Sequence, residues 1–174
     1  MKRTYIALLR GVNVGGKNKV NMKELIQYLD EKGISNSKYY LQSGNIIFDS
    51  QEMKSESLEE IISCIIKDKF NLEIPVIIID KEIITNALTN NPFKDVDTER
   101  IFFMFIDKRP DDTLVESIKS FESIDSYIID ERVIYLNINP PYHETKLTNN
   151  FFEKKLKVKA TTRNYNTTKK LIDL

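Results

Sequence analysis

The sequence contains very little cysteine, histidine and tryptophan. Cys64 and His143 are the single residues of their kinds, and tryptophan is absent from the 174 residues. One cysteine cannot form an internal disulfide, and a single unpaired cysteine indicates a reducing cytoplasm. A zinc site needs several His or Cys ligands and a Ser-His-Asp triad needs this one histidine, so metal catalysis through His and Cys is excluded. Carboxylate-bound Mg²⁺ is not excluded, but we predict no metal site and no cofactor.

The contexts of these two residues favour structural roles for both. Cys64 lies in the apolar run Ile61–Ile66, which predicts a buried and inert thiol. His143 follows Pro140-Pro141-Tyr142 in a predicted loop, and we do not favour it as a catalytic group.

Long hydrophobic runs are also missing. No segment approaches the roughly 18 apolar residues of a membrane span. The apolar stretch before Arg10 is shorter than the about 7–15 residues of a signal peptide core. We therefore expect a cytoplasmic protein with no membrane partner. With 41% apolar and 30% charged residues, the chain has the composition of an ordinary globular protein.

The net charge is zero because two basic ends cancel an acidic middle. Basic and acidic residues each number 26. Residues 1–23 carry six basic and no acidic side chains, and residues 142–174 carry eight basic and three acidic ones, which leaves 12 basic and 23 acidic residues between them. The overall balance argues against a generic basic nucleic-acid binder, whereas the basic ends favour an anionic ligand. We expect both ends to help line one face.

The first half of the chain shows strand and helix signals in the order β-α-β-β-α-β. One helix begins at the capping-box pair Asn21 and Glu24 and stops at Gly33, and a second capping pair, Ser57 and Glu60, opens another helix. The predicted strands cover residues 4–9, 39–42, 45–49 and 76–79. This order is that of the split βαβ, or ferredoxin-like, plait.

The second half repeats this order without repeating its residues. The predicted strands cover residues 101–106, 126–129, 133–138 and 158–163, and Asn166 is predicted to cap a short final helix. The expected fold class is α+β, a duplicated ferredoxin-like (βαββαβ) α/β plait with two similar halves. We expect a first plait over residues 1–80, a helical linker over 81–100 and a second plait, packed on the first, over 101–174.

Glycine is scarce, and four of the five glycines fall in two short segments. Gly11–Lys17 nearly matches the phosphate-binding pattern G-x-x-x-x-G-K, but Asn18 stands where that motif needs a Ser or Thr to hold Mg²⁺. Glycines nevertheless let backbone N–H groups converge on an anion. The candidate ligand-binding residues of this loop are Arg10, Asn13, Gly15, Gly16 and Lys17, with Lys19 alongside. The alternative is a tight turn with solvated lysines.

Two further polar segments are candidates for the same site. Gln42, Ser43 and Asn45 surround Gly44 in a predicted hairpin, where they would either face a ligand or only form the turn. In the late segment 160–169 an arginine could clamp a phosphate and an aromatic ring could stack on a base, unless the segment is only a capped helix. The candidates there are Arg163, Asn164 and Tyr165.

These segments recur in the same order in one bacterial family. The chain resembles the domain-of-unknown-function family 1697 over about residues 3–172. The matching residues are Arg10, Gly11, Asn13, Gly15, Gly16, Gln42, Ser43, Gly44, Asn45, Asn91, Pro92, Phe93, Arg163, Asn164 and Tyr165, the last standing where the family commonly has Trp. The resemblance implies a small cytoplasmic protein with a duplicated plait-like fold, and it implies no particular activity.

Three classes of function follow from the residues. The first, which we favour, is binding of a phosphate-bearing ligand, either a nucleotide or nucleic acid, at the glycine-rich loop. The second is an enzyme acting on a small anionic substrate with carboxylate, lysine or tyrosine groups. The third is a homo-oligomeric interaction module without catalysis. The sequence leaves open whether the chain is an enzyme.

Overall fold

The computed structural model describes residues 2–41, 44–51 and 54–174. They divide into two compact units, the first containing the chain as far as Ile84 together with Asp173 and Leu174, and the second containing Thr85–Ile172. The predictions for Gln42 and Ser43 fall outside the described residues.

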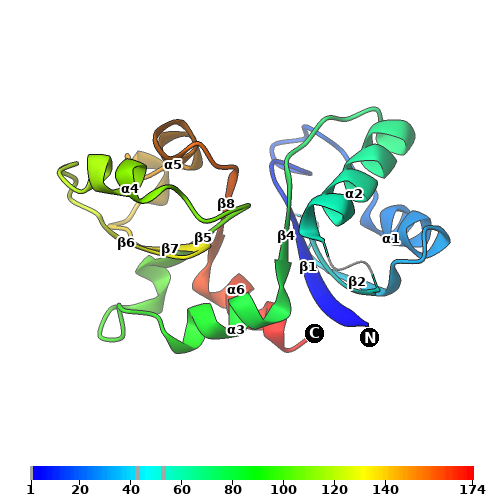
Figure 1. Ribbon diagram of the computed structural model, residues 1–174, viewed down its shortest axis with the longest axis horizontal. Helices are drawn as coiled ribbons and strands as arrows, with labels where there is room; N and C mark the ends of the chain where they lie inside the picture. The colour runs from blue at the N-terminus through cyan, green and yellow to red at the C-terminus, as the bar shows by residue number, and fades with distance from the viewer. Residues whose placement is uncertain (1, 42–43, 52–53) are drawn as a thin grey trace. The chain divides into compact units, whose positions relative to one another are not determined.

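The first unit is a four-stranded antiparallel sheet covered on one face by two helices (Figure 1). The strand order is β2-β3-β1-β4, in which the chain's first and third strands are central. Figure 1 shows α1 and α2 together on the same side of this sheet. The elements are β1 (Arg3–Leu9), α1 (Met22–Glu31), β2 (Ser35–Tyr40), β3 (Asn45–Ser50), α2 (Ser55–Phe70) and β4 (Val76–Asp80).

The second unit repeats this topology with the order β6-β7-β5-β8. Helices α4 and α5 lie over one face of its sheet, and α6 packs against β5 and β8 (Figure 1). The second unit and the helix leading into it comprise α3 (Lys81–Thr89), η1 (Thr98–Arg100), β5 (Ile101–Ile106), α4 (Asp112–Ile118), β6 (Ser126–Asp130), β7 (Val133–Asn137), η2 (Tyr142–Glu144), α5 (Asn149–Leu156), β8 (Ala160–Asn164) and α6 (Tyr165–Ile172). The predicted α+β class with two similar βαββαβ halves is confirmed.

Each unit encloses a core of its own. In the first, alternate residues of β1, among them Tyr5, Ala7 and Leu9, pack with the apolar stripes of α1 and α2. In the second, Met104 and Ile106 of β5 pack with Phe152 and Leu156 of α5. Two-residue alternation in the strands and helical spacing in the helices thus meet over one face of each sheet.

Several local predictions need correction. Strand β2 starts at Ser35 and ends at Tyr40, with an irregularity in its pairing with β3, so the predicted range 39–42 was wrong. Helix α2 starts at Ser55 after Lys54, which makes no side-chain cap, so the predicted capping role of Ser57 was wrong as well. Cys64 is exposed rather than buried, because its position on α2 faces away from the core stripe formed by Leu58, Ile62, Ile65 and Ile66.

Candidate functional site

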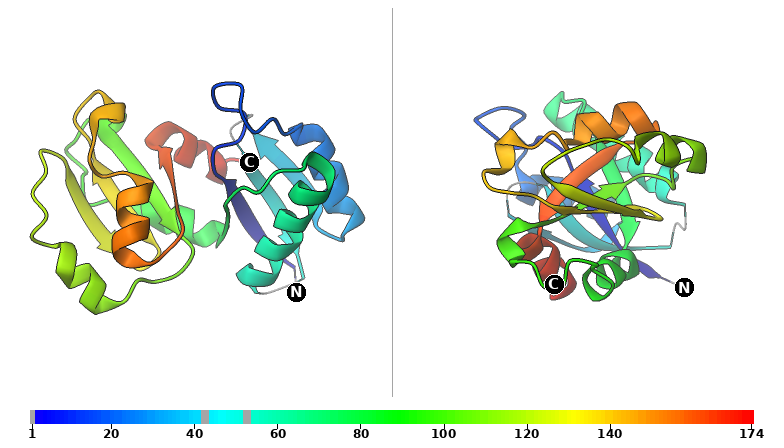
Figure 2. Two further views of the ribbon diagram at one scale, coloured as in Figure 1. Left: turned by 90° about the horizontal axis from the view of Figure 1, so that it is seen from above. Right: turned by 90° about the vertical axis from the view of Figure 1, so that its left-hand side faces the viewer.

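The glycine-rich loop between β1 and α1 contains a miniature hairpin. Gly15 and Gly16 have φ angles of +57° and +74°, and the Lys17 amide donates to the Val14 carbonyl at 3.1 Å. Positive φ at both central residues is the requirement of a type I′ turn, which glycine meets without steric cost. Figure 2 (left) shows the loop projecting from one end of the first sheet.

Two asparagines hold the base of this loop together. The Asn13 side chain accepts from the Val20 amide and donates to the Val20 carbonyl, both at 2.9 Å. The Asn18 side chain donates to the Gly11 carbonyl at 2.9 Å, and the backbone carbonyl of Asn18 accepts from the Asn13 amide at 3.1 Å. These bonds use much of the hydrogen-bonding capacity of the loop base internally, and they leave the tip as the part whose polar groups are directed to solvent.

The residues at the tip of the loop are exposed to solvent. Gly15, Gly16, Lys17 and Lys19 are all exposed, and a side chain added at either glycine would meet nothing within 4 Å. The amides of Gly15 and Gly16 donate to no other residue that the structure describes. The tip therefore presents two backbone donors and two ammonium groups to the solvent.

A hollow of about 640 Å³ lies beside this tip, against the start of α1. At its edge Asn21 caps the helix, accepting from the amides of Lys23 and Glu24, and donates to the Glu24 carboxylate at 2.8 Å. The predicted helix start at Asn21 is thus confirmed, although Glu24 accepts from the Asn21 side chain rather than from its backbone amide as in a capping box. The lining residues are Asn13, Gly16, Lys19, Val20, Asn21, Glu24 and Phe70. Asn21, Glu24 and Phe70 were not among the candidates, and nothing in the sequence places Phe70, at the end of α2, near this loop.

The hairpin after β2 packs directly against the base of the same loop. The Gly44 carbonyl accepts from the Leu9 amide at 2.8 Å. A Cβ on Gly44 would lie 2.5 Å from the Leu9 Cβ and 2.6 Å from Val12 Cγ2, and its φ is +83°. Only glycine allows this approach, so Gly44 joins the two sequence motifs of the first unit.

The neighbouring candidates lie at the same end of the sheet. Asn45 is fully buried, donates its side-chain amide to the Tyr40 carbonyl at 2.9 Å and stands opposite Leu8 in the ladder. Arg10 is half-buried, and its amide donates to the Pro75 carbonyl at 3.0 Å. The fold therefore brings Arg10, Asn13 and Asn45 to the loop base, below the glycines and lysines of the tip.

The late candidates belong to the second unit, where β8 runs directly into α6. Asn164 caps α6 by accepting from the Thr167 amide at 2.8 Å, so the predicted cap at Asn166 was wrong. The Tyr165 ring packs against Phe103, with 6.2 Å between ring centroids. Asn164 and Tyr165 thus both make contacts within the second unit.

Arg163 is the charged member of that group. Its guanidinium donates from Nη1 to the Thr161 hydroxyl and to the Thr162 carbonyl, both at 2.9 Å. Burial lowers the pKa of Arg163 to about 10, because desolvation disfavours the charged form. Burial likewise raises the pKa of Tyr142, against the opposing effects of Thr162 and Arg163. Arg163 stays protonated at neutral pH.

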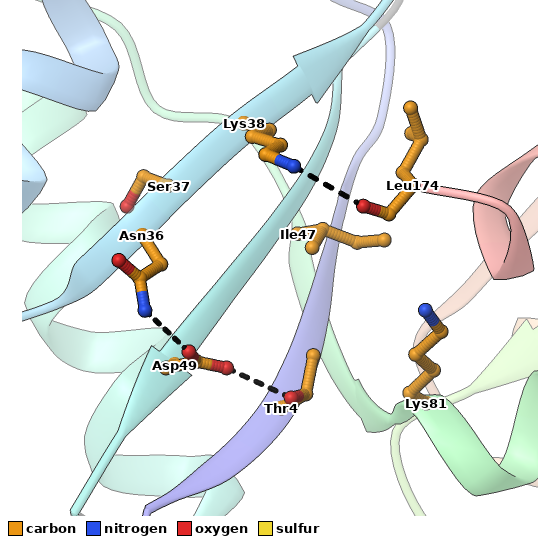
Figure 3. A pocket seen from close by; sticks show the side chains of 8 residues that line it. All are labelled: Thr4, Asn36, Ser37, Lys38, Ile47, Asp49, Lys81 and Leu174. Atoms are coloured by element: carbon orange, nitrogen blue, oxygen red, sulfur yellow. Dashed lines mark hydrogen bonds between the residues drawn. The ribbon is translucent and has the colours of Figure 1, made fainter.

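A second hollow of the first unit, of about 470 Å³, lies over β1, β2 and β3 (Figure 3). Figure 3 shows Lys38 reaching Leu174, whose backbone oxygen accepts from it at 3.4 Å, with Asp49 lying apart. The Asn36 side chain and the Thr4 hydroxyl donate to Asp49 at 2.7 and 2.8 Å and, together with Lys2, lower its pKa. Both carboxylate oxygens of Asp49 are thereby occupied by neighbouring strands.

No group of three or more His, Cys, Asp or Glu side chains is placed to hold a metal ion within the described ranges. None of the described helices is both long enough and apolar enough to cross a membrane.

Taken together, the fold and its loop define an α+β protein of two like-ordered halves with a glycine-rich loop after the first strand. The chain belongs to the family described as "Protein of unknown function (DUF1697)", which it matches over residues 1–135. The match includes the loop, the hairpin and the Asn91–Phe93 turn and ends before β8.

The solved structures that resemble the chain include one that is similar over nearly its whole length. It is that of the conserved bacterial protein SP0830 from Streptococcus pneumoniae, with 26% sequence identity and a TM-score of 0.76. The similarity covers 99% of this chain and 98% of that chain, so both halves of the fold are shared. None of the curated proteins compared matches the chain significantly.

Proposed function

We propose that the tip of the glycine-rich loop binds a phosphate group carried by a nucleotide or by nucleic acid. The observation that carries the proposal is the exposed Gly15-Gly16 turn, whose two amides have no acceptor among the described residues, beside Lys17 and Lys19. Backbone amides that converge on one point bind anions, and ammonium groups add charge to the same hydrogen bonds.

The adjoining hollow gives the rest of such a ligand a place to lie. Its volume of about 640 Å³ is sufficient for a sugar and a base, and Phe70 offers an apolar surface. The start of α1 adds the positive end of a helix dipole on the same side. Glu24 opposes the anion, because its carboxylate lines this hollow too.

The other ligand contacts expected from the sequence remain predictions. Arg10, Asn13 and Asn45 support the loop from below, whereas Gln42 and Ser43 lie outside the described residues. Arg163, Asn164 and Tyr165 belong to the second unit, and the proposal does not depend on them.

The test is binding of inorganic phosphate, ADP and a short single-stranded oligonucleotide to the full chain, measured by calorimetry. In a Lys17→Gln, Lys19→Gln variant we expect roughly tenfold weaker binding, because each exposed ammonium contact contributes about 0.7 kcal/mol. In Glu24→Gln we expect binding to tighten by roughly fivefold, since removing a like charge near the anion is worth about 1 kcal/mol.

The control replaces two lysines of α5, Lys154 and Lys155, by glutamine, which makes the same change of net charge in the second unit. Equal losses in the two double variants would contradict the proposal. A steep fall of oligonucleotide affinity with salt identifies nucleic acid as the ligand, whereas weak salt dependence together with ADP binding identifies a nucleotide.

We also propose that the protein works in the cytoplasm. Cys64 is an exposed thiol with no second cysteine in the chain, and a reducing compartment keeps such a thiol free. Cell fractionation tests this, and recovery of the protein outside the cytoplasm would contradict it.

A further inference from the structure

Strand β6 is an outer strand of the second sheet and pairs only with β7 among the described strands. The pairing is regular over all five residues, from Ser126 opposite Asn137 to Asp130 opposite Val133. Strand β6 contains no proline, no lysine and no bulge. Proline, lysine and bulges are among the devices by which natural proteins prevent an open sheet edge from pairing with another chain.

The outer strand β2 of the first sheet shows what such protection looks like. Its register with β3 shifts between Ser35 and Lys38, and Asn36 within that irregularity has a φ of +55°. Lys38 places an ammonium group in the middle of the strand. Strand β6 instead has the sequence Ser-Tyr-Ile-Ile-Asp, apolar at its centre.

The side chains of β6 leave an apolar residue facing solvent at that centre. Ile128 is 45% exposed, and Ile124, just before the strand, is 86% exposed. Tyr127 and Ile129 point to the opposite face, where they pack against the core of the unit. Exposed isoleucine next to an open edge is the composition of a strand that pairs with another strand.

The backbone groups available on this edge follow from the ladder. Asp130 and Val133 close a two-residue turn, so they form a hydrogen-bonded pair, and the alternation of an antiparallel ladder makes Ile128 and Ser126 hydrogen-bonded to β7 as well. Tyr127 and Ile129 therefore direct their amides and carbonyls outward. No hydrogen bond joins these outward backbone groups to another described residue.

We propose that β6 pairs with β6 of a second copy of this chain, antiparallel and across a two-fold axis at Ile128. This interface goes beyond the proposed anion site and lies in the other unit. In this register Tyr127 and Ile129 exchange hydrogen bonds with Ile129 and Tyr127 of the partner subunit. The second sheet of one copy and the second sheet of the other copy thereby join into one continuous antiparallel sheet.

The strand is complementary to itself in this register, which is why a second copy is the occupant. Ile128 meets Ile128 of the partner subunit at the axis. Ser126 lies opposite Asp130 of the partner subunit, so that a hydroxyl can donate to a carboxylate. Tyr127 lies opposite Ile129 of the partner subunit, which is an aromatic and β-branched pair. Within the five residues of the strand no like charges face each other.

The first test is the mass of the full chain in solution by sedimentation equilibrium, from about 10 μM to about 1 mM, the range of weak to moderate association. We expect a dimer or a mass that rises toward the dimer. Ile128→Lys, which brings two ammonium groups together at the axis, should return the mass to that of the monomer. Val14→Lys is the matched control, since Val14 is also an exposed β-branched residue but lies in the first unit, and it should leave the dimer unchanged.

A wild-type chain that stays monomeric at the highest concentration overturns the proposal, and so does a dimer that survives Ile128→Lys. Circular dichroism of both variants verifies that they are folded. If the chain stays monomeric and its β6 edge instead binds an extended peptide of another protein, the proposal is overturned as well.

The second test examines the register with cysteine in a Cys64→Ser background. Ile128→Cys brings two thiols to a non-hydrogen-bonded pair, whose Cα separation of about 4.5 Å lies within the range of disulfides. Mild oxidation with diamide should link this variant at least about tenfold faster than Ile124→Cys, which meets no copy of itself in this register. Equal rates of linkage overturn the register.

Discussion

Gly44 and Gly15 share a left-handed backbone but have very different surroundings. Gly44 has a φ of +83° and faces Leu9 and Val12 at distances that no Cβ atom tolerates. Gly15 has a φ of +57° and open space around it. The first glycine serves close packing of two segments, and the second serves only the geometry of a turn.

We therefore expect Gly44→Ala to lower the free energy of unfolding by about 3 kcal/mol, as strain and overpacking add together. Gly15→Ala, the control, should cost about 1 kcal/mol, because only the backbone strain remains. Urea denaturation followed by circular dichroism measures both changes. Equal costs at the two positions would show that the contact with Leu9 and Val12 relaxes freely.

Asp49 shows how a short polar network makes stability depend on pH. Hydrogen bonds from Asn36 and Thr4, with a contribution from Lys2, hold its folded pKa below the ordinary value of 3.8. A carboxyl group whose pKa is lowered by folding stabilises the folded state above its unfolded pKa, and this contribution disappears as the pH falls through its folded pKa.

Thr4→Val removes one of the two donors, so the pKa of Asp49 should rise toward 3.8. The variant should accordingly lose less stability than the wild type when the pH falls from about 7 to about 2, whereas Thr4→Ser should behave like the wild type. NMR titration of the Asp49 carboxyl and urea denaturation at both pH values measure these effects. An unchanged Asp49 pKa in Thr4→Val would contradict the assignment.

At the scale of elements, the motif asparagines bind backbone rather than solvent. The Asn13 side chain holds Val20, the Asn45 side chain holds the Tyr40 carbonyl, and Asn91 accepts from the Phe93 amide at 3.1 Å. Asn164 begins α6. A short amide that donates and accepts close to its own backbone suits each of these turns and helix starts.

The junction between β8 and α6 gives the test at this scale. Asn164→Ala removes the side chain that accepts from Thr167, and we expect a loss of about 1 kcal/mol in the free energy of unfolding. Asn166→Ala, two residues later on the exposed side of the helix, should change it by less than about 0.5 kcal/mol. Thermal unfolding of the two variants side by side measures the difference. A larger loss at Asn166 would restore the cap predicted from the sequence.

Helix starts also show how far local patterns reach. Asn21 was recognised as a cap because Glu24 follows at the right spacing, and both of its bonds are present. Ser57 and Glu60 have the same spacing, yet α2 begins earlier. The same four-residue spacing therefore does not by itself determine where a helix starts.

At the scale of the whole molecule, the repeated strand order is the principal result. Both sheets place their first and third strands at the centre, and both bury one face beneath two helices. Strand β2 carries a bulge and a lysine, whereas β6 is regular and has an exposed isoleucine. Outer strands therefore distinguish two units that share a topology.

The basic ends of the sequence lie in different units. Residues 1–23 belong to the first unit, and residues 142–172 belong to the second. Their common face therefore remains a prediction, and the anion site proposed here uses lysines of the first unit alone.

The sequence by itself determined the class and order of the elements. Apolar runs in the strands, helical spacing of apolar residues in the helices and turn residues between them are local signals, and they lead to two βαββαβ halves. The four glycines of the two motifs likewise marked positions that need a positive φ.

Only the tertiary structure decided which motif residues make internal contacts. It assigned Asn13, Asn164 and Tyr165 to internal contacts, brought Phe70 to the loop and turned Cys64 outward. Except for the bonds of Asn13 to Val20, each of these depends on contacts between residues far apart in the chain or on where a helix begins. Patterns of a few residues carry no information about such contacts, because the packing of whole elements determines them.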